Sequence, residues 1–353
     1  MAQLLVGTYT RSAPDPRGTA EGILALEVHG SEVGVPALAA TTTNPSWLCA
    51  SRDGRNIYSV VETSAPSGGG GEVIAFERDR STSALVELGS TSSGGGDPAH
   101  LALDPTERFV VVTNYGSGSV SVLARKPSGE LGPLLDLVQH DGAGPDLDRQ
   151  SAPHPHQTVF DPRTGFALVP DLGLDRVFIY ELTREGTLVE RPDQVISLEQ
   201  GAGPRHVAFH PNGDHLFVLN ELHNTLQVLR RKGARFVATD LKSTVPEDFS
   251  LRSQAGEVCV SASGRVIFAS NRGHDSIAVF RFDERESTIH LAGIHSAGGR
   301  EPRHFISSPD GSFLLVACQK SDTVVSLGVD ERGYSLQVVH TQGVPTPVCL
   351  LPL

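Results

Sequence analysis

Ionisable side chains of three kinds lie close together in one short stretch of this sequence. The stretch from Gly203 to Leu222 carries Arg205 and His206 near its beginning and Glu221 near its end. Between them, two short apolar runs flank a Pro-Asn-Gly-Asp turn, which predicts a β-hairpin. A hairpin folds the chain back, so Arg205, just before the first run, meets Glu221, just after the second. A guanidinium, an imidazole and a carboxylate gathered in this way can bind an anion and transfer protons.

The hairpin pattern around Arg205 is one of several copies along the chain. Complete copies begin at Pro45, Pro98, Pro155, Pro204, Ala255 and Pro302. A seventh begins at Pro347 and stops after one apolar run, while residues 4–9 at the other terminus match the second run of the Pro98 copy. Further β-rich runs follow the hairpins, including 119–123, 177–180, 225–229, 276–280 and 323–327.

A repeat of about fifty residues with four strands is typical of a β-propeller blade. The sequence therefore predicts an all-β fold, a seven-bladed β-propeller with four-stranded blades, in which residues 1–353 form a single domain. The 37 glycines and 23 prolines agree with many short strands joined by turns. Because the seventh copy is divided between the termini, we expect pairing of the N- and C-terminal strands to close the ring.

The repeat register places particular residues around one mouth of the central channel, because the inner strand of each blade lines that channel. The place after each start holds Ser46, Ala99, His156, Arg205, Gly256 and Arg303. The place seventeen residues after each start holds Glu62, Tyr115, Leu172, Glu221, Arg272 and Gln319. The first two blades offer mostly neutral or small groups, so we expect charge on the side of the later blades. Three arginines there would form the basic pocket that an anionic substrate requires.

Each of these residues also has a structural interpretation. Arg205 and Arg303 could brace neighbouring blades, and Glu221 could serve only as the ion-pair partner of Arg205. The His154-Pro-His156 spacing is a weak metal signal without Asp or Cys ligands nearby, so we expect no metal and no cofactor. The histidines at the hairpin turn, 210 and 215, are expected at the surface of the opposite mouth.

Composition limits the partners of the protein. A net charge of −12 disfavours nucleic acid and anionic membrane surfaces. The first residues have neither a basic segment nor a long apolar core, so we expect no signal peptide, no membrane span and a cytoplasmic location. The four cysteines are far apart, which favours reduced thiols over disulfides. We expect a monomer or weak homo-oligomer.

The sequence resembles a known family in the motifs that carry these groups. The matching segments are Arg149-Gln150, Pro153 to His156, Gly203 to His206, Asn220 to Leu222, Ser270 to Ser276 and Pro302-Arg303. They resemble the seven-bladed propeller lactonases, which include bacterial propeller-type 6-phosphogluconolactonases and fungal carboxymuconate-lactonizing enzymes. In the latter, a histidine, two arginines and a glutamate are proposed to form the active site. By motif these resemble His154 or His156, Arg205, Arg272 and Glu221, while Gly256 and Glu257 depart from the Pro-Arg-His pattern.

The resemblance implies hydrolysis of a small anionic lactone, 6-phosphogluconolactone in the pentose phosphate pathway being the first choice. We expect Glu221 to activate water, one of His154 and His156 to protonate the leaving oxygen, and two arginines, 205 and 272, to stabilise the oxyanion. The expected substrate-binding residues are Arg149, His206, Glu257, His274 and Arg303.

Two other functions remain open at this stage. Cycloisomerisation of a muconate needs the same arginines and an acid/base pair, so the sequence does not separate it from hydrolysis. A noncatalytic propeller that binds a partner protein is disfavoured by the clustering of ionisable groups at one mouth.

Overall fold

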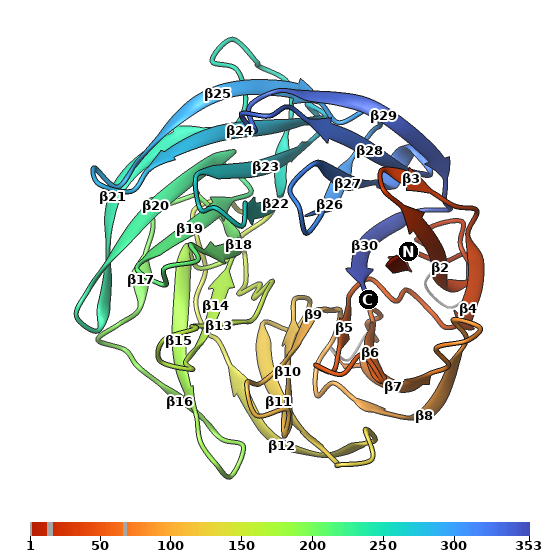
Figure 1. The fold of residues 1–353 in the computed structure, drawn as a ribbon. Coiled ribbons are helices and arrows are strands. Elements are labelled where there is room, and N and C mark those ends of the chain that lie inside the picture. The colour runs from red at the N-terminus through yellow and green to blue at the C-terminus, as the bar shows by residue number, and fades with distance from the viewer. Residues whose placement is uncertain (1, 13–16, 66–68) are drawn as a thin grey trace.

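The protein is a ring of seven antiparallel β-sheets around a central axis (Figure 1), seen in a computed structural model that describes residues 2–12, 17–65 and 69–353. Blade 1 contains β5 (Leu48–Ala50), β6 (Asn56–Val61), β7 (Glu72–Arg78) and β8 (Leu85–Ser92). Blade 2 contains β9 (Pro98–Leu103), β10 (Phe109–Asn114), β11 (Ser119–Arg125) and β12 (Leu131–Gln139). Blade 3 contains β13 (Val159–Phe160), β14 (Ala167–Asp171), β15 (Arg176–Leu182), β16 (Leu188–Glu190) and β17 (Ile196–Ser197).

The next three blades contain the segments that carry most of the predicted site. Blade 4 contains β18 (Pro204–Phe209), β19 (His215–Asn220), β20 (Thr225–Lys232) and β21 (Arg235–Ser243). Blade 5 contains β22 (Gln254–Val260), β23 (Val266–Arg272), β24 (Ser276–Asp283) and β25 (Thr288–Ser296). Blade 6 contains β26 (Pro302–Ser307), β27 (Phe313–Cys318), β28 (Thr323–Val329) and β29 (Leu336–Gly343), with a short 3₁₀ helix at Gln319–Ser321.

Blade 7 is built from both ends of the chain. It contains β30 (Pro347–Pro352), β1 (Ala2–Thr8), β2 (Gly22–His29), β3 (Glu32–Val33) and β4 (Ala37–Thr41). Strand β1 pairs antiparallel with β30, so that Leu5 lies opposite Leu351. The predicted seven blades and the predicted closure by the terminal strands are therefore confirmed.

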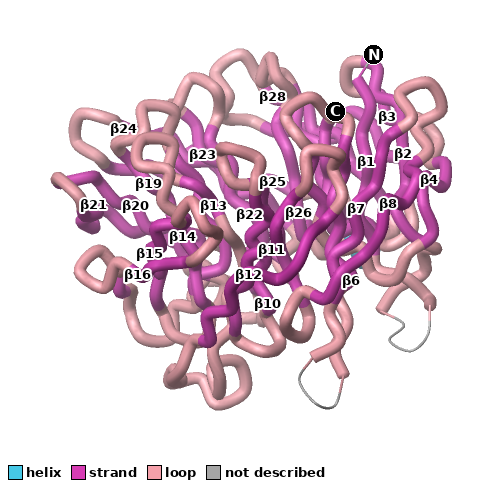
Figure 2. The backbone as a smooth tube through the Cα atoms, turned by 90° about the horizontal axis from the view of Figure 1, so that it is seen from below, coloured by secondary structure: helices cyan, strands magenta, loops and turns pink. Residues whose placement is uncertain are grey.

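Loops gather at the two ends of the strands and form two faces of the ring, as the side view in Figure 2 shows. The turn between the first and second strand of each blade lies at one face, and the residues that precede the first strand and follow the second lie at the other. We call the second face the upper mouth and the first the lower mouth. Chemistry-bearing residues at the starts of the repeats therefore belong to the upper mouth.

The inner strands of five blades carry a β-bulge at one register position. In blade 4, Pro204 pairs with Asn220 and His206 pairs with Leu219, which leaves Arg205 as the extra residue. Arg205 thus lies within β18. The expectation that it would precede the first strand was wrong. A bulge re-aims a side chain, which allows both Arg205 and His206 to reach partners at the channel.

Apolar side chains from facing sheets fill the space between neighbouring blades. Between blades 4 and 5, for example, Phe217, Leu226 and Phe280 are fully buried in one cluster. Dense packing of this kind holds the inner strands rigidly and so fixes the side chains that they present to the channel. The turn histidines His210 and His215, expected at the surface, are buried against Phe282 in this region, so that expectation was wrong.

Two smaller expectations concern the cysteines and the membrane. All four cysteines are free thiols, as predicted. Within the described part of the chain, no helix is long and apolar enough to cross a membrane.

Candidate active site

A cavity of about 190 Å³ opens where the upper mouth meets the central channel. Its lining comes from six blades and one long loop, and consists of Glu62, Ala99, Tyr115, Arg149, His156, Glu221, Arg272 and Arg303. Five of these eight residues were predicted as site residues from the sequence. The repeat register therefore located the cavity, although the cavity needs residues from blades on both sides of the ring.

Glu221 lies at the centre of an ion-pair cluster and is almost fully buried. One carboxylate oxygen lies 2.6 Å from Arg149, and the other lies 2.7 Å from Arg272 and 3.3 Å from the Nε of Arg205. Burial alone would raise the pKa of Glu221, but the three guanidiniums outweigh it and lower the pKa to about 2. Glu221 is thus a fixed anion at neutral pH that holds three arginines in place.

Arg205 lies behind this cluster and is only 2% exposed. Its guanidinium donates a hydrogen bond to the backbone oxygen of Gly256 in blade 5. A side chain at Gly256 would meet Ser270 and the backbone of Pro302. Only glycine therefore allows the backbone at position 256 to lie this close to both. Burial and the neighbouring Arg272 lower the pKa of Arg205 to about 9, which still leaves it charged at neutral pH.

A second charged group faces Glu221 from the other side of the cavity. The carboxylate of Glu62 lies 2.7 Å from Arg17 and accepts a hydrogen bond from the hydroxyl of Tyr9. Arg303 donates to the same hydroxyl over 3.0 Å. Charge is therefore not confined to the later blades, because Glu62 and Arg17 belong to blades 1 and 7.

His156 is the imidazole of the cavity lining and is 6% exposed. Its Nδ1 lies 3.2 Å from Nε2 of His206, and its ring meets the ring of Tyr115 edge-on at 5.6 Å. Burial, with Arg205 and His206 as further causes, lowers the pKa of His156 well below 6.5. His156 is therefore neutral at neutral pH and can accept a proton.

Two of the predicted histidines, His154 and His274, are not part of the cavity lining. His154 stacks on Tyr115 at 4.4 Å and its Nδ1 lies 2.8 Å from the backbone oxygen of that residue. His274 bonds through Nδ1 to the hydroxyl of Ser276 and packs against Phe249. Of the two members of the His154-Pro-His156 pair, the structure thus brings only His156 to the cavity.

The predicted residues His206 and Glu257 lie deeper in the channel. His206 Nδ1 is 2.9 Å from a carboxylate oxygen of Glu257, and both residues are buried. They contact the cavity through His156 and do not line it.

Tyr115 and Glu62 are cavity residues that the sequence analysis did not select. Both occupy the register place that also holds Glu221 and Arg272. The repeat register therefore pointed to them, but they were not selected because their two blades carry mostly neutral or small groups. Tyr9 and Arg17 come from blade 7, where the repeat is divided between the termini and the register gives no guide. Tyr115 accepts a hydrogen bond from Arg149, which couples blade 2 to the Glu221 cluster.

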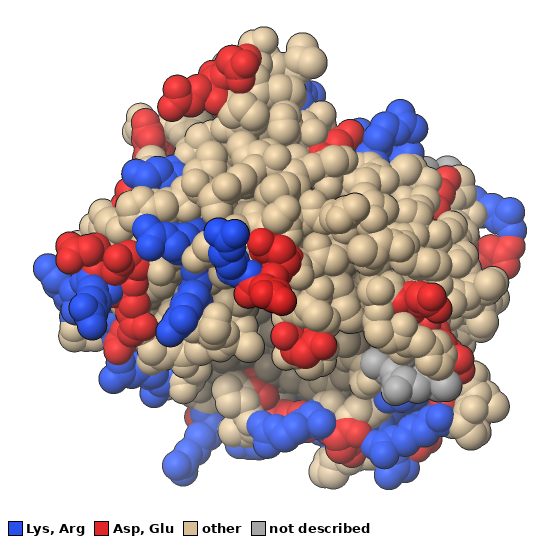
Figure 3. Space-filling model, turned by 45° about the horizontal axis from the view of Figure 1, so that its top comes forward, with Lys and Arg blue, Asp and Glu red and all other residues tan. Residues whose placement is uncertain are grey.

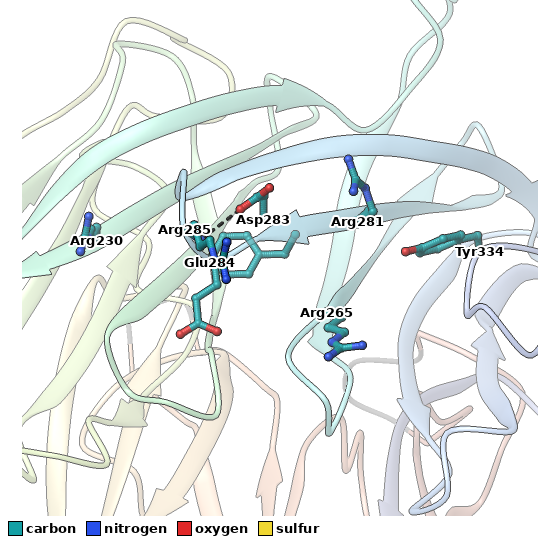
Figure 4. A pocket seen from close by; sticks show the side chains of 8 residues that line it. Arg230, Arg265, Arg281, Asp283, Glu284, Arg285 and Tyr334 are labelled. Carbon is teal, nitrogen blue, oxygen red and sulfur yellow. Dashed lines mark hydrogen bonds between the residues drawn. The ribbon is translucent and has the colours of Figure 1, made fainter.

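A larger hollow of about 780 Å³ lies at the lower mouth, around the β24–β25 turn. It is lined by Arg230, Arg265, Arg281, Phe282, Asp283, Glu284, Arg285 and Tyr334. All four arginines are exposed, and Figure 4 shows their side chains spread along the hollow without converging on one point. Exposed, spread charges of this kind are screened by water and do not form a preorganised site.

The electrostatic character of the upper cavity is local. On the face in view in Figure 3, Lys and Arg side chains are interspersed with Asp and Glu along the rim. At the cavity, by contrast, the charges are paired in a fixed arrangement. Three arginines (149, 205 and 272) contact Glu221, and Arg17 contacts Glu62. Arg303 bonds the hydroxyl of Tyr9. No group of three or more His, Cys, Asp and Glu side chains that could hold a metal ion occurs among the described residues.

This arrangement can bind an anion, stabilise a developing negative charge and move one proton. The excess of guanidiniums supplies the first two capacities, since arginine binds carboxylate and phosphate oxygens in a fixed geometry. The neutral imidazole of His156 supplies the third.

Comparison with known proteins agrees with this chemistry. Residues 3–352 match the family model described as "Lactonase, 7-bladed beta-propeller". The chain is 32% identical to a 6-phosphogluconolactonase of Bacillus subtilis over 98% of this chain and 96% of that protein. A 6-phosphogluconolactonase of Formosa agariphila is 28% identical over 95% of this chain and 94% of that protein. The structure of a periplasmic gluconolactonase of Pseudomonas aeruginosa superposes with a TM-score of 0.92 and 29% identity, covering 100% of this chain and 99% of that one.

Proposed function

Because the chain belongs to the seven-bladed β-propeller lactonase family, we propose that it hydrolyses an anionic sugar lactone, 6-phosphogluconolactone in the first place. The observation that carries this proposal is the ion-pair cluster at the cavity, in which guanidiniums outnumber carboxylates beside a neutral imidazole. An uncharged lactone would not use this excess of positive charge.

Arg303 is the residue that we propose for recognition of the substrate's phosphate. Arg149, Arg205 and Arg272 each contact Glu221, whereas Arg303 contacts the neutral hydroxyl of Tyr9. Its guanidinium therefore contacts a neutral hydroxyl where the other three contact a carboxylate, and a phosphate dianion offers it several strong acceptors.

Hydrolysis in this cavity would proceed through a tetrahedral intermediate. His156 removes a proton from water as the water oxygen attacks the lactone carbonyl carbon. The carbonyl oxygen becomes an oxyanion, which Arg272 stabilises. When the ring C–O bond breaks, the imidazolium of His156 gives its proton to the departing ring oxygen, so that one water is consumed and one hydroxy acid is formed.

Glu221 takes a different role here from the one that the sequence suggested. A carboxylate paired with three arginines and with a pKa of about 2 is a weak base at neutral pH. Its contacts favour an anchoring role, in which it orients Arg149, Arg205 and Arg272 toward the substrate. The base role therefore passes to His156.

The direct test compares three compounds with the purified protein at constant pH: 6-phosphogluconolactone, gluconolactone and cis,cis-muconate. Acid release above the uncatalysed rate is measured for the lactones, and loss of absorbance for the muconate. We expect fastest turnover of the phosphorylated lactone, and turnover of the muconate alone would replace hydrolysis by cycloisomerisation. Arg281→Ala, which alters only the lower mouth, is the control for nonspecific loss.

We also propose that the protein acts in the cytoplasm, where 6-phosphogluconolactone would be formed. Fractionation of cells that produce the tagged protein, with a periplasmic marker enzyme alongside, tests this compartment. Recovery with the periplasmic marker would instead favour an unphosphorylated lactone as substrate.

A further inference from the structure

A layer of buried and half-buried side chains lies in the channel directly beneath the cavity. It occupies the register place two residues after the starts of the repeats, and includes Trp47, His100, His206, Glu257 and His304. These residues come from five blades and meet on the ring axis, where the ring centroids of Trp47 and His304 lie 5.0 Å apart. The proposed hydrolysis uses none of them directly.

Three side chains form a continuous chain of contacts from this layer to the cavity. His156 Nδ1 lies 3.2 Å from His206 Nε2. His206 Nδ1 lies 2.9 Å from Oε2 of Glu257. The chain therefore runs from a buried carboxylate through one imidazole to the imidazole of the cavity lining.

Backbone groups fix the direction of the hydrogen bonds at the buried end. The backbone N–H of Val258 donates to Oε1 of Glu257, and that of Leu350 donates to Nδ1 of His304. Nδ1 of His304 is thus an acceptor, so a neutral His304 carries its proton on Nε2, which lies 3.4 Å from Oε2 of Glu257. Burial raises the pKa of Glu257, while His304, Arg205 and the Val258 N–H act against that shift by favouring the carboxylate. The donors placed around it make Glu257 the acceptor at this end of the chain of contacts.

The positions of the protons on His206 and His156 follow because a neutral imidazole carries one N–H proton. Burial lowers the pKa of His206 well below 6.5 and that of His304 to about 4, so both are neutral at neutral pH. His206 must donate from Nδ1 to Glu257, which makes its Nε2 an acceptor. His156 must then donate from Nδ1 to His206, which leaves its Nε2 as the unprotonated nitrogen.

We propose that His206 and Glu257 are positioning residues that hold His156 in the tautomer whose Nε2 accepts a proton at the cavity. This inference rests on the proposed lactone hydrolysis, and it extends that mechanism by a buried imidazole and a carboxylate. The carboxylate also compensates the positive charge that His156 gains when it accepts a proton, although the imidazole of His206 separates them.

Glu257→Gln tests the proposal because it changes the direction of the hydrogen bonds with little change in shape. The amide oxygen keeps the bond from Val258, so the NH₂ group takes the place of Oε2 and donates to His206 Nδ1. His206 then carries its proton on Nε2 and donates to His156 Nδ1, which moves the proton of His156 to Nε2. We expect kcat to fall by about 10²-fold or more with KM changed by less than about threefold.

His100→Gln is the matched control. His100 lies in the same layer with 4% exposure, and its Nδ1 accepts from the backbone of Thr158 outside the chain of contacts. We expect this variant to lose thermal stability as Glu257→Gln does, but to keep kcat within about threefold. Equal kcat losses in the two variants would show that the layer has only a structural role and would overturn the proposal.

The tautomer itself is measured without any substrate, by ¹⁵N NMR of histidine-labelled protein, with His156 assigned through its absence in His156→Gln. We expect Nδ1–H at His156 in the wild type and Nε2–H in Glu257→Gln. Nε2–H in the wild type would overturn the proposal whatever the enzyme turns over. Failure of all lactones to react, with the expected tautomers present, would instead overturn the proposed function and confine the chain of contacts to a structural role.

Discussion

The upper cavity and the lower hollow lie at the two mouths of the same ring and both are rich in arginine, yet they differ in what surrounds the charges. At the upper mouth, Glu221 is buried and holds three arginines within 3.3 Å. At the lower mouth, arginines such as Arg265 and Arg281 are exposed and spread apart (Figure 4). The lower hollow is several times larger.

The difference indicates that burial and pairing, and not size or the number of charges, hold charged side chains in a fixed arrangement on this scaffold. A paired charge in a low-dielectric environment is held in one geometry and acts strongly on a ligand. An exposed charge is mobile and screened. The comparison is therefore tested by making the same kind of substitution at one residue of each mouth.

The largest difference is expected for the imidazoles. His156→Gln removes the proposed base at the upper mouth, so kcat should fall by about 10²–10⁴-fold. His215→Gln removes a buried histidine near the lower mouth whose Nε2 bonds Ser287, and should leave kcat within about threefold. Steady-state kinetics on the lactone measures both, and equal losses would contradict the contrast between the mouths.

A second difference is expected for the carboxylates. Glu221→Gln leaves three buried or half-buried arginines without their anion, so the free energy of unfolding should fall by about 3–5 kcal/mol. Glu284→Gln at the lower mouth removes an exposed carboxylate bonded to Asn212, and should change it by less than about 0.5 kcal/mol. Denaturant titration measures both, and an unchanged midpoint for Glu221→Gln would remove its proposed anchoring role.

Acid should act first on the buried histidines beneath the upper mouth. The pKa of His304 is lowered by burial to about 4, from an ordinary value of 6.5. Below pH 6.5 the unfolded chain therefore binds more protons than the folded one, and stability falls as the pH falls from 6.5 toward 4. His304 alone accounts for about 3 kcal/mol of this loss.

The measurement is chemical denaturation between pH 4 and 7. A His304→Gln variant should lose less stability over this range than the wild type. The catalytic rate should also fall in acid, because protonation of His156 removes the proposed base. This fall in kcat/KM should begin only below the lowered pKa of His156.

The smallest effect is expected for recognition of the anion. Arg303→Ala should reduce kcat/KM for 6-phosphogluconolactone by about 10–100-fold, the worth of a charged hydrogen bond. It should reduce kcat/KM for gluconolactone less, because that compound has no phosphate. Arg281→Ala should change either value by less than about twofold, and a similar loss on both lactones for Arg303→Ala would place the phosphate elsewhere.

The repeat made most of the fold predictable, because its strands are local patterns of apolar runs and turns. The seven starts, the strand order within a blade and the closure by β1 and β30 all follow from it. The strand bounds near the site were less accurate. The bulge at Arg205 extends β18 beyond the apolar run, and no apolar pattern reports a bulge.

The sequence by itself also determined which register places carry the chemistry, and so brought Glu221, Arg272, Arg303 and His156 to one mouth. Only the tertiary structure decided which partners these side chains contact and how deeply they are buried. His154 and His156 are two residues apart, but one stacks on Tyr115 while the other joins His206. These outcomes depend on contacts between blades far apart in sequence, which set burial and hydrogen-bond direction. A local pattern places a residue at the channel, whereas its protonation and its partner are properties of the closed ring.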